Sequence, residues 1–264
     1  MPKFFVVSDV HGFYDELIDA LNKAGFDRNN PEHWVIGCGD FFDRGPDPYG
    51  VMSFFMGLPR KILVRGNHED LFEECVERGC WGSHDLNNGT FDTICELGGA
   101  GLGRDFEECC IIAEQRVKLF FSTMVNYFET KNYIFVHGWI PVAVKDGLPP
   151  YYRRNREFAP DPDWRHAHAR EWENARWLNG MDMAHSGFGE LGKTIVCGHW
   201  HCSYGHMLDS IKTDCWLSEF DDDAIWDPYH GNGVIAIDAC TAHTGKVNVL
   251  VLEDEFLEDN NESN

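Results

Sequence analysis

Five short apolar segments of this chain are each followed by glycine and by side chains that can bind a metal ion. Most of them are rich in valine and isoleucine, as expected of buried β-strands. Helical stretches lie between several of them, and this alternation favours an α/β architecture. In open α/β sheets ligands bind beyond the carboxyl ends of the strands, so these side chains are candidates for one shared site. They stand in the sequences Asp9-Val10-His11-Gly12, Gly39-Asp40, Gly66-Asn67-His68, His137-Gly138 and Gly198-His199.

The predicted elements form one domain over residues 1–252. A helical insertion is expected over about residues 71–124, with glycine-rich breaks at Gly79–Gly82 and Gly98–Gly103. The acidic residues 253–264 read as a solvated C-terminal tail. Helices are predicted at Tyr14–Ala24 and Pro48–Met56. The predicted strands are Phe4–Ser8, Trp34–Gly37, Ile62–Val64, Tyr133–Val136, Thr194–Cys197, Val234–Ile237 and Val247–Leu252.

The candidate ligands combine carboxylate and amide oxygens with imidazole nitrogens and include no thiolate. Such a set suits manganese, iron or zinc. Asp40 is the candidate for a carboxylate that bridges two ions about 3.5–4 Å apart, the spacing of two-metal hydrolases. An ion pair of this kind lowers the pKa of a bound water and neutralises phosphate oxygens during in-line attack.

Each motif alone also has a structural interpretation. Asp9 is of a type that commonly caps a strand-to-helix connection, and Asn67 with His68 could simply shape a turn. A lone histidine in an apolar context, such as His137, is more often a core residue than a ligand. The repetition of the pattern after five predicted strands favours the metal site over these separate explanations.

The net charge of the chain limits the classes of molecule that it is expected to bind. With 44 acidic and 22 basic residues, the formal net charge is −22. Such a surface repels phosphate backbones, which argues against broad nucleic-acid binding. No apolar run is long enough to span a bilayer, so no membrane partner is expected. The N-terminal residues lack the pattern of a secretory signal, which predicts a cytoplasmic protein.

Three of the motifs read Ser8-Asp9-Val10-His11-Gly12, Gly39-Asp40-Phe41-Phe42-Asp43-Arg44-Gly45 and Arg65-Gly66-Asn67-His68-Glu69. They resemble the signatures of the phosphoprotein phosphatases, calcineurin-like binuclear metallophosphoesterases that include serine/threonine phosphatases. The resemblance continues in order through His137-Gly138 and Gly198-His199 and looks closest to the small bacterial and phage members. It implies the fold of that family, a central β-sandwich flanked by helices.

The resemblance also implies a role for each motif residue. The first metal would take Asp9, His11 and Asp40, and the second would take Asp40, Asn67, His137 and His199. A hydroxide that bridges the two ions would attack phosphorus in line. His68 would be the general acid that protonates the leaving alkoxide, and Asp43 would orient its imidazole. Three arginines would bind the phosphate of the substrate, since the planar guanidinium group matches phosphate geometry. These are Arg44, Arg65 and, by a looser local match, Arg176.

The last histidine motif departs from the protein-phosphatase pattern. It reads Gly198-His199-Trp200-His201, and many metallophosphoesterases outside that branch carry Gly-His-x-His with the second histidine on the first metal. His201 is therefore a candidate seventh ligand, with a supporting or solvent role as the alternative. An arginine-rich segment from Arg153 to Trp177 also has two interpretations, a basic rim for a phosphopeptide or a solvated helix face.

The predicted activity is that of a protein serine/threonine phosphatase with two divalent ions, manganese being the expected metal and iron or zinc the alternatives. Its partner would be a phosphorylated protein or peptide. The alternative is a dinucleoside-polyphosphate or other nucleotide phosphohydrolase. Symmetrical dinucleoside tetraphosphatases resemble this chain but typically have Ala in place of Asp43 and Asp in place of Glu69. A nuclease fits less well, because the acidic charge weighs against it although the Gly-His-x-His sequence mildly supports it. A non-catalytic metal-binding module also fits less well, because Asp40, Asp43 and His68 are all present.

Overall fold

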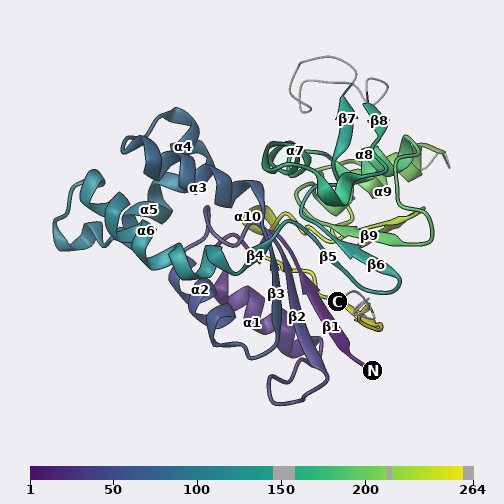
Figure 1. The fold of residues 1–264 in the computed structure, drawn as a ribbon, viewed down its shortest axis with the longest axis horizontal. Coiled ribbons are helices and arrows are strands. Elements are labelled where there is room, and N and C mark those ends of the chain that lie inside the picture. The colour runs from purple at the N-terminus through teal and green to yellow at the C-terminus, as the bar shows by residue number, and fades with distance from the viewer. Residues whose placement is uncertain (145–157, 213–215, 258–264) are drawn as a thin grey trace, which may run out of the picture.

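Two five-stranded sheets lie at the centre of the computed structural model, which describes residues 1–144, 158–212 and 216–257 (Figure 1). In the first sheet β1 to β4 run parallel and β12 is antiparallel to β1. Its order is β12 (Leu250–Glu253), β1 (Lys3–Val7), β2 (His33–Cys38), β3 (Lys61–Val64) and β4 (Met124–Val125). The order of the second is β10 (Tyr229–Gly231), β11 (Val234–Ala236), β9 (Thr194–Cys197), β6 (Tyr133–Phe135) and β5 (Phe128–Glu129). A separate pair joins β7 (Val142–Val144) and β8 (Phe158–Pro160).

The alternation of side chains along β1 shows how the layers are built. Phe4 and Val6 belong to a core that also contains Phe135 and Val196 of the second sheet, so this core lies between the two sheets. Phe5 and Val7, which alternate with them along the strand, face the opposite way, into a core shared with the N-terminal helices. Because successive residues of a strand point to opposite faces, one strand supplies both cores. The predicted β-sandwich flanked by helices is therefore confirmed.

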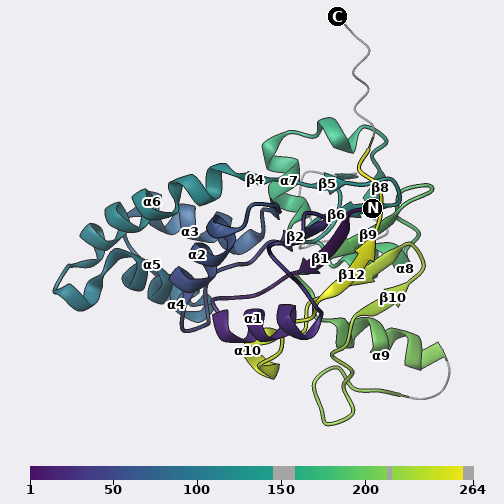
Figure 2. The ribbon, with the colours of Figure 1, turned by 90° about the horizontal axis from the view of Figure 1, so that it is seen from below.

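Helices cover the outer face of each sheet, with α1 to α6 on one side and α7 to α9 on the other (Figure 1). Viewed from below, α3 to α6 project to one side of the sheets (Figure 2). No helix within the described ranges is long and apolar enough to cross a membrane. The helices are α1 (Tyr14–Lys23), α2 (Pro48–Gly57), α3 (Asn67–Arg78), α4 (Ser83–Asn88), α5 (Thr90–Gly98), α6 (Phe106–Ser122), α7 (Ala169–Ala175), α8 (Gly180–His185), α9 (Cys202–Lys212) and α10 (Thr241–Thr244), with 3-10 turns η1 (Ala100–Leu102) and η4 (Trp164–His166).

Some boundaries differ from the sequence-based expectation. The last strand begins at Leu250 rather than Val247, because its pairing with β1 ends where Val6 lies opposite Leu250. Five strands of two or three residues, β4, β5, β7, β8 and β10, were not predicted, since segments this short carry no periodic signal. The helices of the insertion begin at Asn67, so the first turn of α3 carries two predicted site residues. Arg153, Arg154 and Arg156 of the arginine-rich segment lie outside the described residues.

The first residues of the predicted acidic tail contact the second sheet. Asp254 is buried and accepts hydrogen bonds from the main chain and the side-chain amide of Asn132. Phe256 pairs with Thr130 in an isolated bridge and packs edge-on against Phe4. Residues 254–257 are therefore attached to the edge of the sandwich, whereas residues 258–264 of the tail fall outside the described part of the chain.

The aromatic core beneath the first sheet gives a test of the packing. Phe120 on α6 is 1% exposed and contacts the rings of Phe41, Phe42 and Phe55. Replacing it with Ala should lower the free energy of unfolding by about 3–5 kcal/mol, because the substitution leaves a cavity in a close-packed core. Denaturant titration of Phe120→Ala would measure this loss. The neighbouring Leu119→Ala is the control, since Leu119 is 62% exposed and should change stability by less than about 0.5 kcal/mol.

Candidate metal centre

The Asp40 carboxylate, just beyond β2, lies at the centre of two clusters of metal-competent side chains. Its Oδ2 atom is 3.9 Å from Nε2 of His11, 3.9 Å from Nε2 of His68 and 3.3 Å from Nε2 of His137. One cluster contains His11, Asp40 and His68, and the other contains Asp40, His137 and His199. Within each cluster the potential ligand atoms lie within 4.8 Å of one another. Asp40 is thus shared by two adjoining sites, as a bridging ligand would be.

Asn67 joins the second of these clusters. Its Oδ1 atom is 2.8 Å from Nε2 of His137 and 2.9 Å from Nδ1 of His199. The four side chains predicted to hold the second ion therefore converge, although they come from the ends of β2, β3, β6 and β9. Strands of two different sheets contribute, so the site lies where the carboxyl ends of both sheets meet.

Asp9 is buried beside these clusters but is not a member of either. Its carboxylate accepts a hydrogen bond from the Ser8 hydroxyl at 2.5 Å and one from the main-chain N–H of His199 at 3.0 Å. The close approach of His199 depends on Gly198, because a Cβ atom there would lie 2.1 Å from the Asp9 carboxylate. The glycine before this histidine thus lets two strand ends come together.

The backbone at the strand ends is in an unusual conformation. Six of the eight non-glycine residues with positive φ in the described ranges belong to the predicted site. Non-glycine residues in the left-handed region each cost about 1–3 kcal/mol, and such residues gather at functional sites. The side chain of Glu69 supports this backbone by accepting hydrogen bonds from the N–H groups of Asp40, Phe41 and Gly66. The six residues are Asp9, His11, Asp40, Asp43, Arg44 and His199, with φ from 50° to 68°.

Main-chain carbonyls fix the orientation of two imidazoles. Nδ1 of His11 is 2.8 Å from the carbonyl oxygen of Phe42, and Nδ1 of His137 is 2.8 Å from that of Cys38. A carbonyl can only accept, so each Nδ1 donates and each Nε2 faces Asp40. Metal-binding histidines are commonly oriented by such a hydrogen bond.

The electrostatics of the site fit the binding of cations. Burial raises the pKa of Asp9 to about 6, and the charge of Asp40 adds to this effect. Burial acts on Asp40 as well, but the imidazoles of His137 and His68 hold the pKa of its carboxyl well below its usual range. Burial would lower the pKa of His137, yet the Asp40 carboxylate raises it to about 10. Among the described residues no lysine or arginine forms an ion pair with Asp9 or Asp40, so a divalent cation would supply the missing positive charge.

His68 has a second polar neighbour on the side away from Asp40. Its Nδ1 donates to Oδ2 of Asp43 at 2.7 Å. The same Oδ2 accepts from the hydroxyl of Thr90 at 2.7 Å, and the N–H of Asp43 donates to the hydroxyl of Thr93 at 3.0 Å. Both threonines lie on α5, so the helical insertion holds Asp43 against the imidazole. Nε2 of His68 faces Asp40 and lies 3.0 Å from Nη2 of Arg44.

The three predicted phosphate-binding arginines fall into two places. Arg44 lies over the first cluster, with Nη1 2.8 Å from Nε2 of His11 and Nη2 3.0 Å from Nε2 of His68. Arg65 and Arg176 instead share one carboxylate: Nε of Arg65 donates to Oδ1 of Asp70 at 2.6 Å, and Nη1 of Arg176 donates to Oδ2 at 2.7 Å. Asp70 therefore holds two guanidiniums side by side next to the first turn of α3.

His201 lies apart from both clusters. Its Nε2 forms an ion pair with Glu219 at 2.7 Å, and its ring packs against Phe220 and Trp226. In the part of the chain that the structure describes, it is in neither group of side chains that could hold a metal ion. The structure thus gives His201 a carboxylate and two aromatic rings as its neighbours.

Two residues of the site were missed by the sequence analysis. Thr90 is 47 positions from the Asp43 carboxylate to which it donates, and Asp70 is 106 positions from Arg176. Neither belongs to a local motif, and a threonine at the start of a helix or an acid in its first turn is common for reasons of capping alone. Only the packing of α5 and α7 against the strand ends reveals their contacts.

Comparisons with known proteins identify relatives. Residues 2–203 match the family model described as calcineurin-like phosphoesterase. The chain is 41% identical over 66 residues to the symmetrical bis(5'-nucleosyl)-tetraphosphatase of Proteus mirabilis (strain HI4320), which covers 25% of this chain and 23% of that protein. It is 36% identical over 77 residues to the protein of that name from Nitrosospira multiformis (strain ATCC 25196 / NCIMB 11849 / C 71), covering 29% and 27%. The matches thus span about a quarter of the length of these relatives.

A solved structure shares the fold. The cold-active protein-tyrosine phosphatase of a psychrophile, Shewanella SP., superposes with a TM-score of 0.53 at 18% identity, over 96% of this chain and 76% of that one. At this level of identity the likeness concerns the arrangement of the sheets and helices alone.

The shared position of Asp40 gives a test of the metal centre. We expect the purified protein to bind about two Mn²⁺ ions per chain and Asp40→Asn to lose both, because each cluster would lose its only carboxylate. Equilibrium dialysis followed by elemental analysis would measure the stoichiometry. Asp92→Asn, an exposed change on α5, is the matched control. Two ions retained tightly by Asp40→Asn would refute a bridging role.

Proposed function

Because the chain belongs to the calcineurin-like phosphoesterase family, we propose that it is a metal-dependent phosphomonoesterase that acts on phosphoserine and phosphothreonine in peptides or proteins. The observation that carries this choice is the 2.7 Å hydrogen bond from His68 to Asp43. It supports a general acid, which an alcohol leaving group requires. The net charge of −22 argues against nucleic acid as the substrate.

Two divalent ions, for which we propose manganese, would be held by Asp9, His11, Asp40, Asn67, His137 and His199. The mixture of oxygen and nitrogen donors supports this assignment. When bound, such ions supply Lewis-acid activation of water and neutralise charge on the phosphate oxygens. For His201 we propose a supporting role rather than that of a seventh ligand, since its neighbours are Glu219 and aromatic rings.

The proton chemistry belongs to His68. An alkoxide is a strong base, so its departure is slow unless it is protonated as the bond to phosphorus breaks. The Asp43 carboxylate accepts from Nδ1 of His68, which leaves Nε2 to carry the proton that is donated. The hydroxyl of Thr90 on α5 donates to the same oxygen of Asp43 and restrains the carboxylate, which in turn fixes the direction of the imidazole.

Arg44 is the proposed phosphate ligand, since its guanidinium lies beside both His11 and His68. A planar guanidinium can bind two phosphate oxygens at once. Arg65 and Arg176, which Asp70 holds as a pair, would add positive charge beside the first turn of α3. We propose that they bind the substrate from that side.

A dinucleoside polyphosphate is the second candidate substrate. The names of the curated relatives favour it, since these are symmetrical bis(5'-nucleosyl)-tetraphosphatases. The leaving group of such a substrate is itself a phosphate, a much weaker base than an alkoxide, and it needs little protonation. The Asp43–His68 pair would then contribute less to the rate, which is why we place this substrate second.

A direct comparison of substrates tests the proposal. We expect the Mn²⁺-loaded protein to hydrolyse a phosphoserine peptide with at least about a tenfold higher kcat/KM than a dinucleoside tetraphosphate, a difference of about 1.4 kcal/mol. Release of phosphate and of nucleotide would be followed side by side in one buffer. The reverse preference would keep the metal chemistry and replace the substrate.

Substitution of the acid tests the mechanism. His68→Asn should lower kcat on the phosphoserine peptide by about 10²–10⁴. The loss on p-nitrophenyl phosphate should be much smaller, because that leaving group is a weak base. Metal content measured on the same samples is the control, since His68 also lies in one of the two clusters. If the variant loses metal along with activity, His68 is a ligand rather than the acid.

A further inference from the structure

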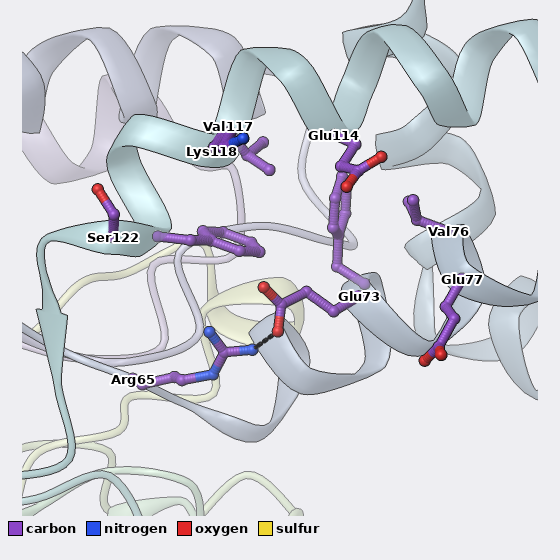
Figure 3. A pocket seen from close by; sticks show the side chains of 10 residues that line it. Arg65, Glu73, Val76, Glu77, Glu114, Val117, Lys118 and Ser122 are labelled. Atoms are coloured by element: carbon purple, nitrogen blue, oxygen red, sulfur yellow. Dashed lines mark hydrogen bonds and ion pairs between the residues drawn. The ribbon is translucent and has the colours of Figure 1, made fainter.

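A groove of about 770 Å³ lies between α3 and α6 (Figure 3). Its floor is apolar, since Phe72 and Val117 are almost completely buried and Phe121 is 7% exposed. Acidic side chains border it on both helices, Glu73 and Glu77 from α3 and Glu114 from α6. The full lining is Arg65, Phe72, Glu73, Val76, Glu77, Glu114, Val117, Lys118, Phe121 and Ser122.

One guanidinium of the chain already occupies the end of this groove. Arg65 forms an ion pair with Glu73 (Figure 3). Its guanidinium carbon lies 5.4 Å from the centre of the Phe121 ring. The groove therefore has the two features that bind an arginine or lysine, an apolar surface for the methylene stem and a carboxylate for the cationic group. Over residues 1–144, 158–212 and 216–257, neither Glu77 nor Glu114 has an ion-pair partner.

Arg65 links the groove to the arginine pair that we propose to bind phosphate. Arg65 contacts Glu73 in the groove and Asp70 at its end, and Asp70 in turn binds Arg176. The first turn of α3 contains His68, and Glu73 and Glu77 follow on the same helix. At about 1.5 Å per helical residue, Glu73 and Glu77 lie about 7–14 Å along α3 from His68. An extended peptide covers that distance with about two to four residues.

We propose that this groove is a specificity subsite that binds a lysine or arginine side chain of a phosphopeptide substrate, about two to four positions from the phosphorylated residue. This inference rests on the proposed function, because it requires a peptide as the substrate. Three glutamates and two cations, Arg65 and Lys118, border the groove. Glu73 already pairs with Arg65, and Glu77 with Glu114 outnumbers Lys118, so the groove keeps a negative charge that attracts a cation. The net charge of −22 also draws cationic peptides toward the molecule.

The test uses the Mn²⁺-loaded full chain and a set of phosphoserine peptides. Each peptide carries a single Arg, or Gln in its place, at two, three or four positions before or after the phosphoserine. We expect kcat/KM to be about five- to tenfold higher with Arg than with Gln at one of these positions, as one partly exposed ion pair with its buried stem implies. The preference is a ratio measured on one sample, so loss of folded protein does not alter it.

Charge-neutral variants assign the preference to the groove. The double variant Glu77→Gln with Glu114→Gln should reduce the Arg preference to about one, while Glu73 is kept because it holds Arg65. The double variant Glu107→Gln with Glu108→Gln is the matched control, since it removes the same two charges from exposed sites on α6 outside the groove and should keep the preference.

Each other outcome overturns the inference and identifies its cause. Peptide hydrolysis without an Arg preference, or with a preference that the double variant keeps, refutes the groove and leaves the proposed phosphatase function in place. Hydrolysis of a dinucleoside tetraphosphate without hydrolysis of any peptide refutes both the substrate class and the groove.

Discussion

The buried carboxylate of Asp40 is the feature on which the rest of the site depends. It belongs to both clusters of candidate ligands, and three imidazoles from separate segments point their Nε2 atoms toward it. A charge in such a place is expensive unless opposite charge surrounds it. The strained backbone of the strand ends, the absent side chain at Gly198 and the hydrogen bonds to Glu69 all serve to bring these segments close. Their cost makes sense when cations complete the arrangement, since a bound ligand stabilises the folded state that binds it.

The positions of the candidate ligands could be located from the sequence because each motif is local. A short apolar strand followed by glycine and a polar residue marks a strand end, and parallel strands bring their ends to the same edge. This reasoning located Asp40, Asn67, His137 and His199, which the structure brings together. The division of the strands between two sheets does not follow from periodicity, since Phe4 and Phe5 are equally apolar. The β-sandwich was instead implied by the family resemblance.

The remaining contacts could not be predicted because they join distant segments. The hydroxyl of Thr90 reaches Asp43 only through the packing of α5, and the pairing of Asp70 with Arg176 requires α3 and α7 to meet. Arg65 differs, because its partners are near it in the sequence. Its motif implied a phosphate ligand, and its guanidinium is held by Asp70 and Glu73, which follow it on α3. His201 likewise sits in a Gly-His-x-His sequence, and its neighbours come from the segment of Glu219 to Trp226.

Substrate selection must therefore depend on residues outside the strand-end motifs. A phosphopeptide and a dinucleoside polyphosphate would both need the same ions, so the clusters around Asp40 cannot distinguish them. The two substrates differ in the basicity of the leaving group and in what flanks the phosphate. In the proposed function the helical insertion addresses both differences, because α5 holds Asp43 against His68 and α3 with α6 form the acidic groove. The candidate metal ligands thus lie at the ends of the strands, and the proposed selectivity would come from the helices inserted between those strands.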